Sequence, residues 1–390
     1  MSAGFAYKEP QISQMSNVVT SFNALNETEL QIVHVRTQAP KQNYEQIDTI
    51  RFLTIFLILW QHCLVGWDKI VPQSFLQEAL LTFVLQIGRI STVVFFIISG
   101  FLLQPKLKNY TLFSYFKERI PKVFGPWFLF VCVFMLINMV YFMPFRALWA
   151  DRDIKEFFIL SYKLLNGVLL HSAYWFITTY MFSMALIVGF KKHVAKIWFG
   201  IALCVFTAFY CVNQHYQWID PNHTKAVLSY SFFIWLGMRI KVNFSKIESF
   251  IKGTPWTVVI LTFLAVFLVA AFEGHQLSLL HSKDPFATNR FTNILLSIVF
   301  FLTLLKVGKI SRINKLNARK TVFGIYLVHS IVILGLMLII KASFMHQLEV
   351  LNIWKLLLFQ ISFALGILYI TYKIVKILAG TRLGWVIGCR

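Results

Sequence analysis

The sequence predicts an all-α protein, a polytopic membrane helix bundle of about ten transmembrane helices. Of its 390 residues, 58% are hydrophobic and only 14% are charged. The mean hydropathy of +0.67 is far too high for a soluble domain of this length. The apolar residues also gather in stretches of about 17–25 residues, which is the length that a helix needs to cross a bilayer. We therefore expect lipid to solvate most of the chain.

Ten such stretches follow one another along the chain, separated by polar or charged segments. They are 50–67, 83–103, 124–143, 173–190, 197–212, 226–240, 256–272, 290–307, 321–340 and 354–378. The segment 150–172 is less apolar, because Lys163 and Asn166 interrupt it. We expect an outer-face helix or a re-entrant segment there.

Lysine and arginine residues set the expected orientation, because cytoplasmic loops retain them. With the N-terminus inside, the four inner loops carry 18 basic residues and the five outer loops carry 10. We therefore predict that both termini are cytoplasmic. This topology and contact with anionic headgroups account for most of the formal charge of +21, so we expect no nucleic-acid partner.

The chain divides into three expected parts. Residues 1–46 are rich in Gln, Asn, Ser and Thr and lack a basic segment before an apolar core, which predicts a flexible polar cytoplasmic tail and no signal peptide. The transmembrane domain is expected over 47–380, and 381–390 would form a short cytoplasmic tail. The five cysteines show no C-x-x-C spacing, so we expect neither a disulfide framework nor a metal site.

Two polar side chains in the first apolar stretch, Arg51 and His62, have an informative spacing. Eleven residues are almost three helical turns, so both side chains would project from one face, roughly 16 Å apart along the axis. An arginine near one membrane boundary and an imidazole about halfway across predict a polar path that leads inward from that boundary. Asp48 lies one turn before Arg51 and is expected to pair with it.

Four further polar residues lie in or beside the second and third stretches. Arg89 needs a partner or a water-filled cavity, because burying an arginine in a membrane costs about 2.5–3.5 kcal/mol. Ser99 precedes a glycine, a pair typical either of close helix packing or of a site lining. Arg119 and Lys122 lie one turn apart, where they either snorkel to the headgroups or bind phosphate groups of a cytosolic ligand.

Three residues in later stretches complete the set of candidates. Trp175 opens the fourth stretch at its expected outer boundary, where tryptophan is usually a residue of the interfacial belt. Tyr326 and His329 share one face of the ninth stretch. A lone intramembrane histidine is more often structural than catalytic, but ionisable residues on several stretches favour a functional site.

Taken in order, these segments resemble the acyltransferase 3 family of integral membrane acyltransferases. Arg51 and His62 resemble its opening signature of an arginine and a histidine. The run from Arg89 to Phe101 is similar to its second-span pattern, which ends Phe-Phe, two apolar residues, Ser-Gly. The segment from Arg119 to Pro126 is similar to its pair of basic residues before a proline, and Phe323 to His329 is similar to its late Ile-Tyr-Leu, apolar, His.

The chain departs from the family pattern at two places. Lys122 stands where the family more often has arginine, which weakens bidentate phosphate recognition at that position. The segment that begins at Trp175 lacks the glutamate of members that carry an extra extracytoplasmic domain. The chain therefore looks closer to the standalone branch, which acts on surface polysaccharides.

The resemblance implies an O-acyltransferase, most simply an O-acetyltransferase, in a bacterial inner membrane. The donor would be a cytosolic acyl-CoA such as acetyl-CoA, with no bound cofactor, and the acceptor a hydroxyl of a cell-envelope polysaccharide or its lipid-linked precursor. Besides membrane lipid, these two substrates are the expected partners.

Site roles follow from the same resemblance. His62 and Arg51 would be the catalytic residues, with His62 as the general base. Arg119 and Lys122, together with Arg51, would contact the nucleotide phosphates or the thioester end of the donor. The supporting residues, some of them candidate orienting or oxyanion groups, would be Asp48, Arg89, Ser99, Trp175, Tyr326 and His329.

The alternative is transport. A bundle with buried arginine and histidine is also compatible with a transporter or exporter of a glycan or a small metabolite, driven through a proton-linked histidine. Against this, the sequence shows no internal repeat and no matching pair of spans broken by glycine or proline. Only an enzyme changes the acceptor covalently, so that observation separates the two hypotheses.

Overall fold

The computed structural model describes residues 44–67, 70–141, 154–343 and 352–389. By its internal contacts the chain divides into two units, Met1–Tyr44 and Glu45–Arg390. The fold below is that of the second unit. The tail expected over 1–46 lies outside the described residues except for its last three.

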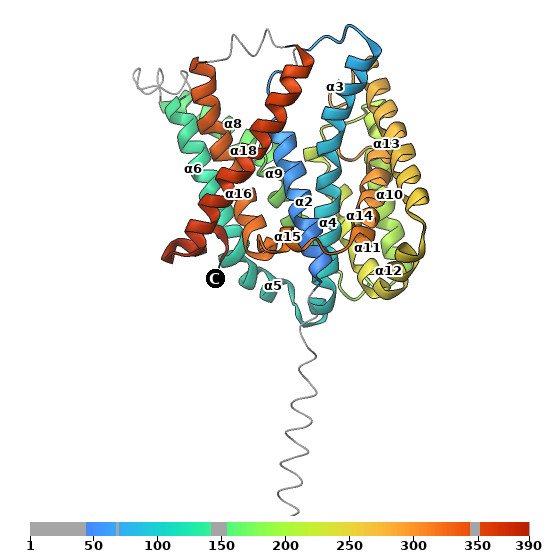
Figure 1. Cartoon of the computed structure of the whole chain (residues 1–390). Helices are drawn as coiled ribbons and strands as arrows, with labels where there is room; N and C mark the ends of the chain where they lie inside the picture. Colours follow the sequence, from blue (N-terminus) through green and yellow to red (C-terminus); the bar gives the residue numbers. More distant parts are fainter. Residues whose placement is uncertain (1–43, 68–69, 142–153, 344–351, 390) are drawn as a thin grey trace, which may run out of the picture. The chain divides into compact units, whose positions relative to one another are not determined.

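Helices make up nearly all of the described chain, and no strand occurs within it (Figure 1). The helices are α2 Glu45–His62, α3 Phe75–Ile87, α4 Ser91–Leu103, α5 Leu112–Arg119, α6 Gly125–Tyr141, α8 Ile154–His171, α9 Trp175–Gly189, α10 Ile197–Tyr216, α11 Ser231–Val242, α12 Phe244–Gly253, α13 Trp256–Leu279, α14 Phe291–Val307, α15 Ser311–Asn314, α16 Ala318–Ser343 and α18 Ile353–Ala379. Short turns of 3₁₀ helix are η2 Gly88–Ile90, η3 Gln104–Asn109, η5 His223–Lys225, η6 Val227–Tyr230 and η7 Arg382–Ile387, and η4 Ile120–Phe124 is a π turn. The predicted all-α membrane bundle is therefore confirmed.

The number of membrane crossings stays a prediction. Each of the ten predicted stretches contains a helix, but in the described part of the chain only six helices are long and apolar enough to cross, or seven if α8 and α9 count as one bent span. Helix α2 carries three charged residues in its first seven, and α11 has only 12 residues. Helices α8 and α9 meet at an angle of 68°, which fits the helix or re-entrant segment expected there.

The loops predicted to be cytoplasmic are tied together at one end of the bundle, which we call the basic end. The Lys191 ammonium donates to the carbonyls of Lys108 and Tyr110, 3.4 and 2.5 Å away. The Lys306 ammonium donates to the carbonyls at the end of α12. Figure 1 shows α5, α12 and α15 near this same end. Which side of the membrane it faces remains a prediction from the charge count.

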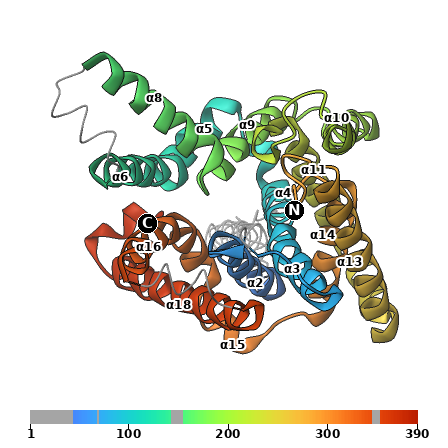
Figure 2. The ribbon, with the colours of Figure 1, turned by 90° about the horizontal axis from the view of Figure 1, so that it is seen from above.

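Helix α2 lies near the middle of the bundle and contacts α4, α14, α16 and α18 (Figure 2). It begins five residues before the predicted stretch and ends five residues before its end. Acidic Glu45 and Asp48 suit its first turn, because they complement the helix dipole. Beyond the helix, Gly66 has a φ of +79°, which turns the chain away. His62 is the last residue of α2, and not a mid-helix residue as the sequence predicted.

Two glycines set the closest helix crossing, between α4 and α11. A Cβ atom on Gly100 would lie 1.9 Å from the carbonyl oxygen of Ile234, and one on Gly237 would lie 1.9 Å from that of Ile97. The two backbones therefore touch through a pair of residues that have no side chains. The sequence left two roles open for Ser99 and Gly100, close helix packing or the lining of a site. Gly100 makes this close crossing, and Ser99 lines a cavity.

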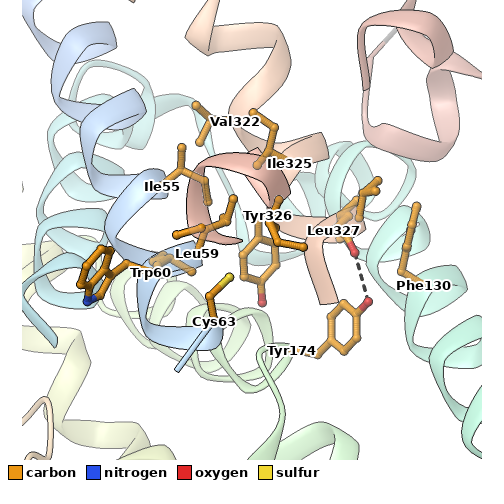
Figure 3. Close-up of a cluster of buried hydrophobic side chains, with 14 of the residues drawn as sticks. Ile55, Leu59, Trp60, Cys63, Phe130, Tyr174, Val322, Ile325, Tyr326 and Leu327 are labelled. Carbon is orange, nitrogen blue, oxygen red and sulfur yellow. Dashed lines mark hydrogen bonds between the residues drawn. The ribbon is translucent and has the colours of Figure 1, made fainter. Parts of the chain in front are cut away.

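A hydrophobic cluster packs α2 against α16 and its neighbours (Figure 3). Ile55 and Leu59 of α2 and Ile325 of α16 are completely buried within it. Cys63 is also completely buried there, which agrees with its interpretation as a packing residue rather than a nucleophile. The Tyr174 hydroxyl donates to the Leu327 carbonyl at 3.0 Å and ties the start of α9 to α16.

The segment expected as a short tail, 381–390, is packed against the bundle where the structure describes it. Ile387 is buried, and Gly388 has a φ of +73°. A Cβ atom on Gly388 would lie 2.5 Å from the Lys122 carbonyl oxygen and 2.8 Å from the Phe323 ring. This segment therefore supports both η4 and α16 at the basic end.

Replacing Gly237 with alanine should destabilise the protein, because the added methyl group cannot fit between α4 and α11. Overpacking of this kind costs typically about 1–3 kcal/mol. Thermal unfolding of the purified protein in detergent should show a Tm several degrees lower. Gly335→Ala is the matched control, because no atom lies within 4 Å of its added Cβ. Equal Tm values for both variants would contradict the close crossing.

The predicted orientation can be tested with a membrane-impermeant maleimide. Lys252 at the basic end and Lys225 at the opposite end are both exposed. We expect Lys225→Cys to be labelled in intact cells and Lys252→Cys only after permeabilisation. The wild-type protein gives the background from its own cysteines. The reverse pattern would show that the termini are extracytoplasmic.

Candidate active site

Two adjoining cavities run beside α2. The larger, which we call the arginine chamber, has a volume of about 240 Å³ and is lined by Arg51, Ile55, Ile58, Phe95, Ser99, Val123, Phe176, Ile177, Tyr180, Ala318, Arg319, Val322, Phe323 and Tyr326. The smaller, the histidine chamber, has a volume of about 60 Å³ and is lined by Ile58, Gln61, His62, Gly88, Arg89, Ser91, Thr92, Ala173, Trp175, Phe176, His223, Thr288 and Tyr326. Three residues, Ile58, Phe176 and Tyr326, line both chambers. The chambers therefore meet at these three side chains.

One stripe of α2 forms a wall of both chambers. Arg51, Ile55 and Ile58 line the arginine chamber, and Ile58 and His62 line the histidine chamber. Steps of four, three and four residues keep these side chains on one face of an α-helix. The polar path expected from the spacing of Arg51 and His62 therefore coincides with a pair of cavities.

Asp48 holds two guanidinium groups at the basic end of the arginine chamber. Its carboxylate oxygens lie 3.1 Å from Nη1 of Arg51 and 2.7 Å from Nε of Arg319. Asp48 was expected to pair with Arg51, but the second partner comes from α16. Because one carboxylate balances only one of two cations, the entrance keeps a net positive charge, which favours an anionic ligand.

Beyond this entrance the arginine chamber is mainly apolar. Its walls come from α2, α4, α9 and α16, and Ser99 adds a hydroxyl that donates to the Phe95 carbonyl at 2.8 Å. The chamber could hold a flexible arm that has few polar atoms, with its charged part outside at the arginines.

His62 faces the histidine chamber at the end of α2. Its ring lies 5.2 Å from the ring of His329, centroid to centroid, and it makes no hydrogen bond within the described residues. His329 is completely buried and lines neither chamber. Because Nδ1 of His329 donates to the Tyr326 carbonyl, its tautomer is set by α16 itself. His329 is thus placed behind His62 as a supporting group.

Arg89 has both the partner and the cavity that its burial requires. It lies on η2, between α3 and α4, and lines the histidine chamber. With the Gln61 amide oxygen turned toward it, Arg89 donates to that oxygen from Nε and Nη2 at 3.3 Å. A Cβ atom on Gly88 would lie only 2.6 Å from the Gln61 amide, so the glycine lets η2 approach α2 closely.

A buried polar network fixes the break at η2. Arg290 is completely buried and donates from Nη1 to the Ala270 carbonyl at 2.9 Å and from Nη2 to the Gln86 side chain. Gln86 donates to Asn293 at 2.7 Å, and Asn293 in turn donates to the Arg89 carbonyl at 3.3 Å. The position of Arg89 is therefore held by backbone and side-chain contacts from α13 and α14.

Trp175 and His223 also line the histidine chamber, and they come from α9 and from η5. Trp175 is buried, with its ring 5.4 Å from that of His223, so it is not a residue of the lipid-facing belt. Nδ1 of His223 donates to the Asp284 carboxylate, and the His223 backbone N–H donates to the same oxygen at 3.3 Å. Burial opposes ionisation of Asp284, but the adjacent His223 and the positive Arg89 hold the pKa of this loop carboxyl below its usual range.

Arg119 and Lys122 are not brought together at either chamber. Arg119 lies 5.6 Å over the Tyr115 ring, and its buried Nε has no hydrogen-bond partner among the described residues. Lys122 is half exposed and lies 3.3 Å from Glu118. The intervening residues form the π turn η4, which rotates the two side chains differently from the α-helical turn assumed from their spacing. Neither residue lines a chamber.

Tyr326 occupies a key position, but its hydroxyl group is already engaged. The hydroxyl donates to the Ala173 carbonyl at 2.7 Å. Tyr326 is therefore better suited to shaping the junction between the chambers than to donating to an oxyanion.

Sequence reasoning missed several residues of the site, namely Gln61, His223, Asp284 and Arg290, and it counted Arg319 only among the 18 basic residues of the inner loops. Gln61 was detectable, because it adjoins His62 in the first stretch. His223 and Asp284 are 61 residues apart in loops, and no local pattern links them. In the described part of the chain, no group of three or more His, Cys, Asp or Glu side chains could hold a metal ion.

Comparison with known proteins identifies the family. The model of the acyltransferase 3 family, described as an acyltransferase domain, matches residues 44–375. No curated protein and no solved structure matches the chain. The matched segment covers most of the chain, from the start of α2 into the second half of α18, and includes every residue that lines the two chambers. This chain belongs to the acyltransferase 3 family and is an integral membrane acyltransferase.

Proposed function

We propose that the protein is an O-acyltransferase, most simply an O-acetyltransferase, of a bacterial inner membrane. It would transfer the acyl group of a cytosolic acyl-CoA to a hydroxyl of a cell-envelope polysaccharide or of its lipid-linked precursor. One observation carries this proposal. A single stripe of α2 joins a cationic entrance at the basic end to an imidazole in a second chamber, and both chambers open along that stripe.

The charged and the extended parts of the donor match different parts of the two chambers. Arg51 and Arg319 present guanidinium groups to the phosphates of coenzyme A, for which planar, forked donors are well suited. The pantetheine arm would then lie in the mainly apolar arginine chamber. The junction at Ile58, Phe176 and Tyr326 would admit the thioester to the histidine chamber.

The size of the histidine chamber supports a short acyl group. A cavity needs a volume of at least about 10–15 Å³ to hold one water molecule. A chamber of about 60 Å³ thus accepts a handful of heavy atoms, as many as an acetyl group and its thioester sulfur contain.

Acyl transfer includes two proton transfers, because the acceptor hydroxyl loses a proton and the departing thiolate gains one. We propose that His62 takes part in these proton transfers. Arg89 would stabilise the negative charge that develops on the thioester oxygen during attack. Arg89 is held in place by Gln61 and Asn293, so it requires little reorganisation when that charge appears.

Loss of the His62 imidazole should abolish most of the transfer. Acid–base catalysis by one residue contributes typically about 10²–10⁴-fold, so His62→Ala should lower acylation at least about 100-fold. Mass spectrometry of the envelope glycans would compare wild type, His62→Ala at equal membrane abundance, and a gene deletion. His275→Gln is the control, because His275 lines neither chamber. An acyl increment that is present in all strains, or in none, would refute the proposed function.

Removing the Arg319 side chain should weaken binding of the donor, and only through the contact with the donor's phosphates. A charge-assisted hydrogen bond contributes about 1.5–3 kcal/mol, so Arg319→Ala should raise KM for acetyl-CoA about tenfold or more. KM for S-acetylpantetheine, which has no nucleotide phosphates, should stay unchanged. Lys315→Ala removes the same charge from an exposed neighbouring position and should change neither value. An equal effect on both donors would argue against a phosphate contact.

A further inference from the structure

The structure contains a second histidine that faces the same chamber, and its environment differs from that of His62. Nδ1 of His223 is committed to Asp284, and Nε2 has no hydrogen-bond partner within the described residues. His62, in contrast, makes no hydrogen bond in the described chain, so no neighbour fixes which of its nitrogens carries the proton. The two imidazoles are therefore prepared for different tasks.

The Asp284 contact determines the tautomer of His223. A carboxylate that accepts from Nδ1–H leaves Nε2 without a proton and with a lone pair available. The side chains of His223 and Asp284 are 12% and 14% exposed, so bulk water competes little for this contact. The carboxylate also stabilises the imidazolium that forms when Nε2 takes a proton.

Packing holds the His223 ring at the chamber. Trp175 meets it edge to face, at 5.4 Å and 84°. The Tyr230 hydroxyl donates to the His223 carbonyl at 3.1 Å, and Tyr230 itself is completely buried. These contacts fix both the backbone and the ring of a residue that lies in the loop between α10 and α11, at the opposite end of the bundle from the arginine entrance.

We propose that the Asp284–His223 pair is the general base for the acceptor hydroxyl, and that His62 serves the donor thioester on the other side of the chamber. This assignment rests on the proposed acyl transfer and gives a different residue the role that the sequence predicted for His62.

The reaction balances with two histidines. The acceptor oxygen forms a bond to the thioester carbonyl carbon as Nε2 of His223 takes the hydroxyl proton. Arg89 stabilises the resulting oxyanion, the carbon–sulfur bond breaks, and the electron pair leaves with sulfur. The proton held by Nε2 of His223 passes through the chamber to His62, which delivers it to the thiolate, so that both imidazoles are neutral again. The net products are an acyl ester and free coenzyme A.

The position of His223 also assigns a side for the acceptor. The donor enters past Arg51 and Arg319 at the basic end, whereas His223 belongs to a loop at the other end. The acceptor hydroxyl is therefore expected to enter past η5 and to meet the thioester between the two histidines. Acceptor and donor then never share an entrance.

The test compares a hydroxyl acceptor with a nucleophile that needs no base. Hydroxylamine attacks a thioester as an uncharged amine, so it does not need to lose a proton first. We expect His223→Gln to lower glycan acylation in cells at least about 100-fold. Hydroxamate formation from acetyl-CoA and hydroxylamine by the solubilised full-length protein should stay within about twofold of wild type. His62→Ala should lose both activities.

Two further variants sharpen the comparison. Asp284→Asn should lower glycan acylation at least about tenfold, because an amide can hold the ring in the wrong tautomer. His275→Gln is the matched control, because Nδ1 of His275 also lies 3.1 Å from a carboxylate, that of Glu78, but its ring lines neither chamber. It should leave both readouts unchanged.

Each other outcome has a defined meaning. Glycan acylation that persists in His223→Gln would overturn the assignment. Loss of both readouts in His223→Gln would overturn it as well, since that result indicates a structural role or a step common to all nucleophiles. Absence of acylation with the wild-type protein would instead overturn the proposed function itself, which this design distinguishes from loss in one variant.

Discussion

The contact between Asp48 and two arginines is the interaction on which the arrangement of the site depends. Asp48 and Arg51 belong to the first half of α2, and Arg319 belongs to α16. The three charges join α2 to α16 at the basic end. A cation in an apolar bundle needs a partner or a cavity, and here both arginines have the same partner and the same cavity. The remaining walls close around the face of α2 that this contact orients.

Much of this arrangement could be predicted from the sequence, because it depends on periodicity. Arg51 and His62 share a stripe for purely helical reasons, and Arg89 was expected to have a partner or to face a cavity because burying its charge is costly. The position of His62 at the helix end was not predictable in this way. The apolar run continues to Trp67, so neither the end of α2 at His62 nor the positive φ of Gly66, four residues further on, shows in it.

The rest of the site depends on contacts between distant segments, which leave no local pattern. His223 and Asp284 meet only because the loops after α10 and α13 lie together. Arg119 and Lys122 diverge because a π turn replaces the α-helical turn that their spacing implied. Trp175 is typical of an interfacial belt by composition, but packing against His223 and Tyr230 turns it inward.

We propose that the two chambers form one path for the donor along α2. Cryo-electron microscopy of the full-length protein with a non-reactive thioether analogue of acetyl-CoA tests this claim most directly. We expect phosphate density at Arg51 and Arg319, the pantetheine arm in the arginine chamber, and the sulfur beside His62. Nucleotide density away from the two arginines, or a sulfur outside the histidine chamber, would contradict it.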